Sequence, residues 1–204
     1  LMVQGNNAWG AMRIGTIEVV PSITEEGKWD SNIDLGAGTG SAAESEKGDF
    51  INTVTPAITF NYNRPLIDIN LGASVGIVRY KEYDKNDAEN YTIGFNAQYG
   101  DIGRNGAYFK VSEMYQDSQD PYDVSGIEDP RYLEGVPKDK KVNVANIEVG
   151  YGLRDRYALH VFYENGYLDY DNFARDRDLN KSEDKMGMVL YYKILPKTFA
   201  TLGY

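Results

Sequence analysis

Hydrophobic and polar residues alternate with a period of two along most of this chain. The pattern is clearest over residues 66–80, where Ile67, Ile69 and Leu71 share one phase and Asp68 and Asn70 share the other. Successive side chains of a β-strand point to opposite faces of a sheet, so this alternation predicts strands with one apolar and one polar face. Helical periodicity is nearly absent, and the fold is therefore predicted to be all-β.

The alternation predicts eight strands and the beginning of a ninth. The first is the weakest, because its phase changes near Thr16, and the fifth is irregular, because Glu113 falls on the apolar phase. The predicted strands cover residues 14–23, 49–62, 66–80, 90–100, 107–116, 145–153, 157–164 and 186–194, and the ninth begins at Thr198.

The connections between these strands alternate in length. Long ones cover residues 24–48, 81–89, 117–141 and 165–183, and short ones cover 63–65, 101–105, 154–156 and 195–197. Every second connection of an up-and-down sheet lies at the same end, so all the long ones fall together. Transmembrane β-barrels have this arrangement, and their tilted strands need about 9 to 11 residues to cross the bilayer. The sequence thus predicts an antiparallel up-and-down transmembrane β-barrel in the bacterial outer membrane.

Tyrosines of the apolar phase lie near both ends of the predicted strands. A tyrosine combines an apolar ring with a polar hydroxyl, which suits the boundary between lipid and water. We expect two bands of interface aromatics: Tyr62, Tyr99, Tyr151, Tyr157 and Tyr192 near the short turns, and Tyr91, Tyr115 and Tyr163 near the long loops.

The chain is polar for a protein with a large core, with a mean hydropathy of -0.51. A barrel with a wet lumen explains this polarity, because only its lipid-facing residues need be apolar. The residues expected to line the lumen are Asp68, Asn70, Asn96, Gln98, Lys110, Glu148, His160, Glu164, Lys185 and Lys193. Neither sign of charge dominates, so no ion selectivity is predicted. A soluble antiparallel sheet with one solvated face also alternates, but it leaves the loop lengths and the tyrosines unexplained.

Composition excludes several classes of function. The 204 residues include no Cys and one His, and the net charge is -10. Disulfides, Cys-based zinc sites and Cys nucleophiles are therefore excluded, and a nucleic-acid partner would need clustered Lys and Arg. A lone His160 without a G-x-S-x-G motif does not predict catalysis. We expect no enzyme, no catalytic residue and no cofactor.

The acidic stretch at residues 169–184 has the oxygen ligands that calcium prefers. Its spacing does not match an EF-hand, and Arg175 and Arg177 would pair with neighbouring carboxylates. We therefore expect an Arg–Asp network there and no metal site. At the outer leaflet, the acidic loops would also meet lipopolysaccharide through bridging divalent cations.

Five segments carry a resemblance to a known family. They are VVPSI at 19–23, WDSNI at 29–33, DFINTVTPAITFNY at 49–62, FARDRD at 173–178 and YYKILPKT at 191–198. In this order they resemble the outer-membrane β-barrel porin family that accompanies exopolysaccharide and capsule export loci in Gram-negative bacteria. The resemblance implies passage or organisation of polysaccharide, or a general porin role, with envelope export proteins as further partners and no catalytic residues.

The unpaired ninth strand bears on the size of the barrel. Bacterial single-chain barrels have an even number of strands, and an unpaired edge is not tolerated in lipid. We expect residues 1–204 to form a single outer-membrane β-barrel domain that continues beyond Tyr204. One alternative is that eight strands close and the tail is an overhang. Another is that Tyr204 is a terminal aromatic, the weak first strand is miscounted, and the barrel has eight or ten strands.

Three functions are compatible with these predictions. The first is a channel for solutes or polysaccharide, with outer-membrane lipids and lipopolysaccharide as partners and oligomerisation left open. The second is a small closed barrel that acts as an adhesin or envelope scaffold through its acidic loops. The third is a soluble glycan-binding β-domain, which Trp9 and Trp29 permit.

Overall fold

The structure is a computed structural model that describes residues 2–8, 10–31, 48–101, 106–119, 139–153, 156–171, 180–195 and 198–203. Within these ranges the chain is almost entirely β-strand, and a short 3-10 helix, η1, covers Asp84–Asn86. The strands are β1 (Met2–Ala8), β2 (Met12–Ile14), β3 (Ile17–Asp30), β4 (Asp49–Arg64), β5 (Ile67–Tyr80), β6 (Ala88–Tyr99), β7 (Gly106–Gln119), β8 (Asp139–Leu153), β9 (Tyr157–Asp171), β10 (Lys181–Leu195) and β11 (Thr198–Gly203). The all-β prediction is confirmed.

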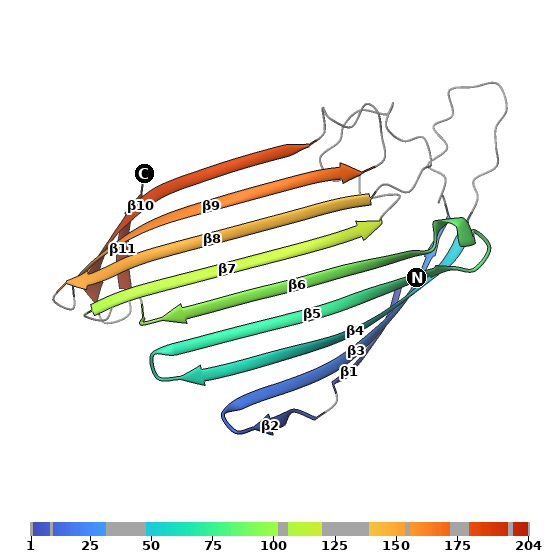
Figure 1. Ribbon diagram of the computed structural model, residues 1–204, viewed down its shortest axis with the longest axis horizontal. Helices are drawn as coiled ribbons and strands as arrows, with labels where there is room; N and C mark the ends of the chain where they lie inside the picture. The colour runs from blue at the N-terminus through green and yellow to red at the C-terminus, as the bar shows by residue number, and fades with distance from the viewer. Residues whose placement is uncertain are drawn as a thin grey trace.

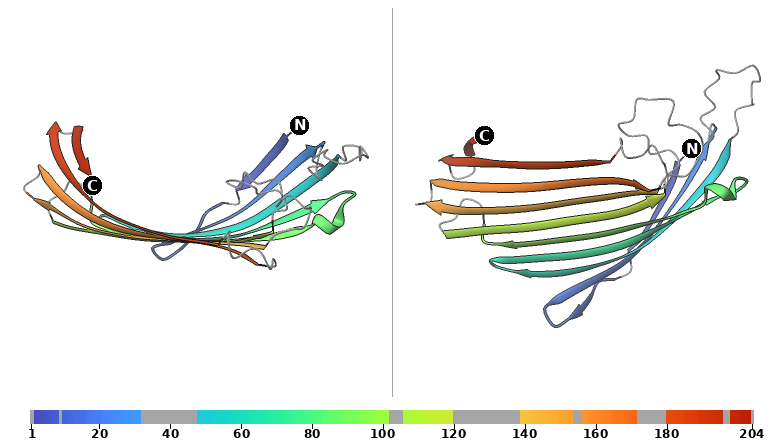
Figure 2. Two further views of the ribbon diagram at one scale, coloured as in Figure 1. Left: turned by 90° about the horizontal axis from the view of Figure 1, so that it is seen from above. Right: turned by 45° about the horizontal axis from the view of Figure 1, so that its top comes forward.

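The strands form one antiparallel sheet in which neighbours in sequence pair with each other (Figure 1). The order from edge to edge is β1-β3-β4-β5-β6-β7-β8-β9-β10-β11. Because β1 and β2 both pair with β3, along different parts of its length, they act as one interrupted edge strand. Figure 2 shows that the sheet is curved and that its two edges bend toward the same side without meeting. The antiparallel up-and-down topology is confirmed, and the sheet is open.

The connecting segments differ in length between the two ends of the sheet. At one end they cover residues 31–48, 81–87, 120–138 and 172–180, and at the other end 15–16, 65–66, 100–105, 154–156 and 196–197. We call these the long-connection end and the short-turn end. The alternation read from the sequence therefore follows from the strand bounds as well.

The strand bounds correct the sequence-based prediction at the N-terminal side. The strands β1 and β2 were not predicted, and residues 24–30, predicted as loop, continue β3. Glu26 pairs with Gln4 on one side and with Thr53 on the other, so backbone pairing extends the strand where side chains give no clear pattern. The phase change near Thr16 is a turn, in which Gly15 has a φ of 63°.

Four other strands are markedly longer than predicted. Residues 117–119, 139–141, 165–171 and 181–183 were assigned to loops, but they belong to β7, β8, β9 and β10. Most of these residues are polar and carry little period-two signal, yet they pair with each other across neighbouring strands. The long connections are therefore shorter than the sequence suggested.

The apolar residues of the sheet do not form an enclosed core. Ile93 and Val149 are 51% and 53% exposed. Within the described ranges, no second sheet covers them, and η1 is the only helix. No helix among the described residues is long and apolar enough to span a membrane.

Candidate functional site

The strand register separates the side chains into two faces. The polar face carries Asn61, Asn70 and Asn96, which are paired in register across β4, β5 and β6. The apolar face carries Phe60, Leu71 and Phe95, which are paired in the same way. All ten residues predicted to line a lumen share the polar face, because they fall on one phase of the paired strands: Asp68, Asn70, Asn96, Gln98, Lys110, Glu148, His160, Glu164, Lys185 and Lys193.

The exposure of the two faces is the reverse of that in a soluble sheet. Large side chains of the apolar face are exposed, whereas His160 and Tyr108 of the polar face are only 1% and 4% exposed. A curved sheet crowds the side chains on its concave face, so the lower exposure indicates that the polar face is the concave one (Figure 2). The sheet is thus apolar on its outer side and polar on its inner side.

One row of polar residues crosses the inner face from β2 to β10. Its members are paired in register from strand to strand: Arg13, Glu18, Asn61, Asn70, Asn96, Ser112, Asn146, Glu164 and Lys185. We call this line the polar row. A second, shorter line of register pairs runs beside it and contains Asp68, Gln98, Lys110 and Glu148.

Hydrogen bonds connect members of the polar row. Asn61 donates from Nδ2 to Glu18 Oε2 at 3.5 Å, and Asn70 donates to Asn61. At the other side of the sheet, Lys185 Nζ donates to Glu164 Oε1 at 3.2 Å. The row therefore offers amide donors and acceptors in its centre, and its charged residues stand at its two ends. Such a surface suits contact with water and polar solutes.

His160 is the centre of a polar cluster drawn from four neighbouring strands. Its Nδ1 lies 2.6 Å from Glu148 Oε1, and its ring centre lies 4.9 Å from that of Tyr108 and 4.8 Å from that of Tyr191. Gly150, which pairs with His160 in register, makes room for the imidazole, because a Cβ there would come within 2.8 Å of His160 Cδ2. The cluster holds β7, β8, β9 and β10 together through their side chains.

This cluster changes the interpretation of the lone histidine. The sequence suggested a lumen-lining side chain, and the phase is that of the polar face, but the ring is buried in the wall. Sequence reasoning missed Tyr108, Gly150 and Tyr191 as its neighbours. The only hint in the sequence was Gly150, a small residue within β8, and a glycine alone does not show which strand supplies the ring that lies over it.

The eight predicted interface tyrosines all lie on the apolar face. The three assigned to the long-connection end donate hydroxyl hydrogen bonds to carboxylates: Tyr91 to Glu89 at 2.7 Å, Tyr115 to Asp117 at 3.5 Å and Tyr163 to Asp184 at 2.7 Å. At the short-turn end, the rings of Tyr157 and Tyr192 pack 5.1 Å apart. Each of these three tyrosines thus bonds to a carboxylate on the same face of the sheet.

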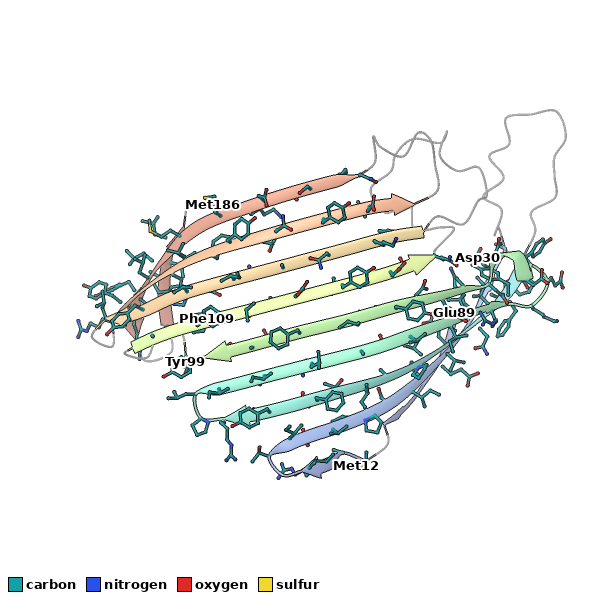
Figure 3. The ribbon with its side chains drawn as sticks, in the orientation of Figure 1. Met12, Asp30, Glu89, Tyr99, Phe109 and Met186 are labelled. Atoms are coloured by element: carbon teal, nitrogen blue, oxygen red, sulfur yellow. The ribbon has the colours of Figure 1, made fainter. Side chains whose placement is uncertain are left out.

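Charged residues surround Arg79 beyond this boundary. Arg79 lies 3.6 Å from Asp87 and 3.4 Å from Glu89. A hydrogen bond from Tyr91, followed by one from Arg79, lowers the pKa of Glu89 below its ordinary value. With Asp117, Gln119 and Lys141 these residues line an open cavity of about 450 Å³ on the apolar face. Figure 3 shows Glu89 at the same end of the sheet as Asp30 and opposite to Tyr99 and Phe109.

A buried carboxylate fixes the connection between β5 and β6. Asp49 is 1% exposed and accepts backbone hydrogen bonds from Phe50, Glu82 and Tyr83 at 2.7 to 3.2 Å. Asp87 accepts a further bond from the Tyr80 amide at 2.8 Å. Two acidic residues that the sequence assigned to solvated loops or strand ends therefore organise the backbone.

Over the described residues, no three His, Asp or Glu side chains are grouped as a metal site requires. Of the acidic stretch at 169–184, Asp169 accepts a hydrogen bond from Asn180 at 2.5 Å, and Asp184 accepts bonds from Tyr163 and Asn165. The predicted network around Arg175 and Arg177 lies outside the described residues.

Comparison with known protein families, curated proteins and solved structures gives no match for this chain. The resemblance to the porin family therefore stays a prediction that rests on the five sequence segments.

Proposed function

We propose that this chain forms the wall of an outer-membrane β-barrel channel whose inner, polar face contacts a solute path. The observation that carries the proposal is the reversed exposure of the sheet, with apolar residues outside and polar residues inside. In water, an uncovered apolar face of this size would be unstable or would associate. In a bilayer, the same face is solvated by lipid, and closure pairs the edges of the sheet.

The course of the apolar residues across the strands supports the same proposal. We call the apolar-face residues within the following ranges the apolar band: 17–23 of β3, 54–62 of β4, 67–77 of β5, 91–99 of β6, 107–111 of β7, 147–153 of β8, 157–163 of β9 and 186–194 of β10. The stretches in β5, β6 and β10 are about as long as the 9 to 11 residues that a tilted strand needs to cross a bilayer.

The apolar band runs diagonally across the strand register. Starting at Ile58 in β4, the register pairs lead through Ile93 and Tyr115 to Ser182, which lies outside the band in β10. The band therefore shifts toward the short-turn end as the sheet is crossed. Strands tilted by about 35–45° against a flat lipid layer produce such a shift.

This shift also accounts for Glu113, which the sequence placed on the apolar phase. Glu113 directly follows the band of β7; it pairs with Phe95, inside the band of β6, on one side, and with Ala145, one step beyond the start of the band in β8, on the other. It accepts a hydrogen bond from Asn143 at 3.0 Å. Its carboxylate thus lies at the boundary of the band and is paired with a polar neighbour.

The proposal is tested by adding the full-length protein, purified from the envelope in detergent, to planar lipid bilayers. We expect discrete ion conductance steps, since a polar face around a lumen holds water. An electrically silent bilayer with the protein inserted and folded would refute the channel and favour the envelope scaffold. Recovery of the folded protein in the soluble fraction without detergent would refute both.

A further inference from the structure

Two exposed aromatic residues lie side by side on the apolar face at the long-connection end. Trp29 of β3 pairs in register with Phe50 of β4, and the two residues are 53% and 43% exposed. Figure 3 labels the neighbouring Asp30 at the same end of the sheet as Glu89. Within the part of the chain that the structure describes, this pair has no covering layer.

These aromatics do not belong to the boundary of the apolar band. Ile23 is the last apolar-band residue of β3, and six residues at about 3.3 Å each place Trp29 about 20 Å farther along the strand. Polar side chains fill the space between: Asn52 donates to Glu25 at 3.3 Å, and Asn52 pairs with Arg79 in register. Interface tyrosines such as Tyr91, by contrast, lie at the end of the apolar band itself.

Glycines make room for both rings. A Cβ on Gly27 would come within 2.8 Å of Phe50 Cζ, and a Cβ on Gly48 would come within 2.8 Å of Trp29 Cζ2. Each ring therefore leans over the backbone of the neighbouring strand, in opposite directions along the sheet. The result is an extended aromatic surface whose outer side no other described residue covers.

The polar residues next to this surface offer hydrogen bonds without a net positive charge. Arg79 is balanced by Asp87 and Glu89, and the Glu25–Asn52 pair supplies a carboxylate and an amide. Lys81, whose amide donates to the Phe50 carbonyl at 3.1 Å, adds a second cationic group beside these three carboxylates. A bare phosphate would require an excess of cationic groups. Hydroxyl groups, which both donate and accept, match the carboxylate and amide better.

We propose that Trp29, Phe50, Glu25, Asn52 and Arg79 form a binding site for the saccharide headgroup of a membrane glycolipid. The proposal rests on the proposed function, which places the acyl chains along the apolar band. From Ile23 outward, β3 and β4 present apolar, then hydrogen-bonding, then aromatic groups. A glycolipid has its acyl chains, polar linkage and sugar rings in the same order. The CH face of a sugar ring packs on the aromatic surface, and its hydroxyls bond to Glu25 and Asn52.

The test uses the full chain in detergent with Trp9, its other tryptophan, replaced by Phe, so that Trp29 is the sole indole reporter. Three probes are titrated: rough lipopolysaccharide, its deacylated saccharide, and phosphatidic acid. We expect both saccharide-bearing probes to shift the Trp29 emission, the intact glycolipid at lower concentration because its acyl chains add contacts. We expect no shift with phosphatidic acid.

Binding is then compared by native mass spectrometry in Trp29→Ala/Phe50→Ala and in a control, Phe109→Ala, which removes an exposed aromatic of the same face at the short-turn end. The double variant should bind the glycolipid about tenfold more weakly, since it lacks both aromatic contacts, and the control should bind as the parent does.

An equal response to phosphatidic acid, or unchanged glycolipid binding by the double variant, would overturn the site. The conductance of the same variants separates the two proposals. A conducting protein without saccharide binding loses only the site. A protein that binds the deacylated saccharide but does not conduct keeps the site and loses the channel.

Discussion

The two faces of this sheet are built from the same strands and the same alternation, yet they differ in what their side chains contact. On the polar face, side chains bond to one another, as in the polar row and the His160 cluster. On the apolar face, the side chains of residues such as Ile93 and Val149 are about half exposed, and no layer of described residues covers them. Side-chain contacts of the apolar face involve charged residues near the long-connection end and a tyrosine pair at the short-turn end. The aliphatic residues between these two ends depend on the surrounding solvent.

The largest effect is expected from a charge placed on either face of one strand. Ile69→Lys places an ammonium group in the apolar band and should cost about 2–4 kcal/mol if that face meets lipid near the bilayer centre. Asn70→Lys, the next residue along, faces the polar side and should cost little. Denaturant unfolding in lipid vesicles measures both, and equal costs would contradict the assignment of the faces.

A smaller effect tests whether the His160 cluster is closely packed. Gly150→Ala would bring a Cβ within 2.8 Å of the imidazole, so the ring must move, and overpacking of this kind costs about 1–3 kcal/mol. Gly94→Ala is the control on the same face, because nothing lies within 4 Å of its Cβ position. Unfolding of the two variants under one condition should differ clearly. A Gly150→Ala variant as stable as Gly94→Ala would mean that the cluster is loose.

Replacing the buried carboxylate of Asp49 should lower the stability of the whole fold less than Gly150→Ala does, and should mainly loosen the connection between β5 and β6. Asp49→Asn loses an acceptor oxygen for the amides of Glu82 and Tyr83, at a cost of about 1–2 kcal/mol. Hydrogen exchange at those two amides should become faster. The control is Glu183→Gln, where an exposed pair with Lys185 at 3.5 Å contributes little. Unchanged exchange would show that other contacts hold the connection.

The smallest expected effect is a titration shift at the boundary of the apolar band. Because the hydrogen bond from Tyr91 is the main cause that lowers the pKa of Glu89, Tyr91→Phe should raise that pKa toward its ordinary value. The lowered pKa means that this interaction stabilises the fold above the unfolded-state pKa and is lost as pH falls through the folded-state pKa. Carbon NMR of the Glu89 carboxyl measures the change. Tyr99→Phe, at the opposite end, should leave it unaltered.

Much of the fold could be predicted because alternation is a local property. A residue such as Leu71 or Asn70 takes its face from its position along one strand, and no knowledge of partners is needed. Alternation did not predict β1, β2 or residues 24–30. These segments are strands because they pair with neighbouring strands, although their side chains show no clear alternation. It also divided the stretch around Thr16 wrongly, since it took a turn for a change of phase.

The candidate site was predictable only in part, for a related reason. The phase of His160 could be read from the sequence, but its burial against Tyr108, Glu148 and Tyr191 depends on three other strands. Likewise, each asparagine of the polar row was visible as a polar residue, whereas the row itself exists only when the strands are in register.

The alternation and the spacing of the strands are enough to predict an antiparallel sheet with long and short connections at opposite ends. The crowding of the concave, polar face, the diagonal course of the apolar band and the position of Glu113 beside that band depend on how the strands are arranged in space. The physical reason is that side-chain direction is set within a strand, whereas register, curvature and burial are set by hydrogen bonds between strands.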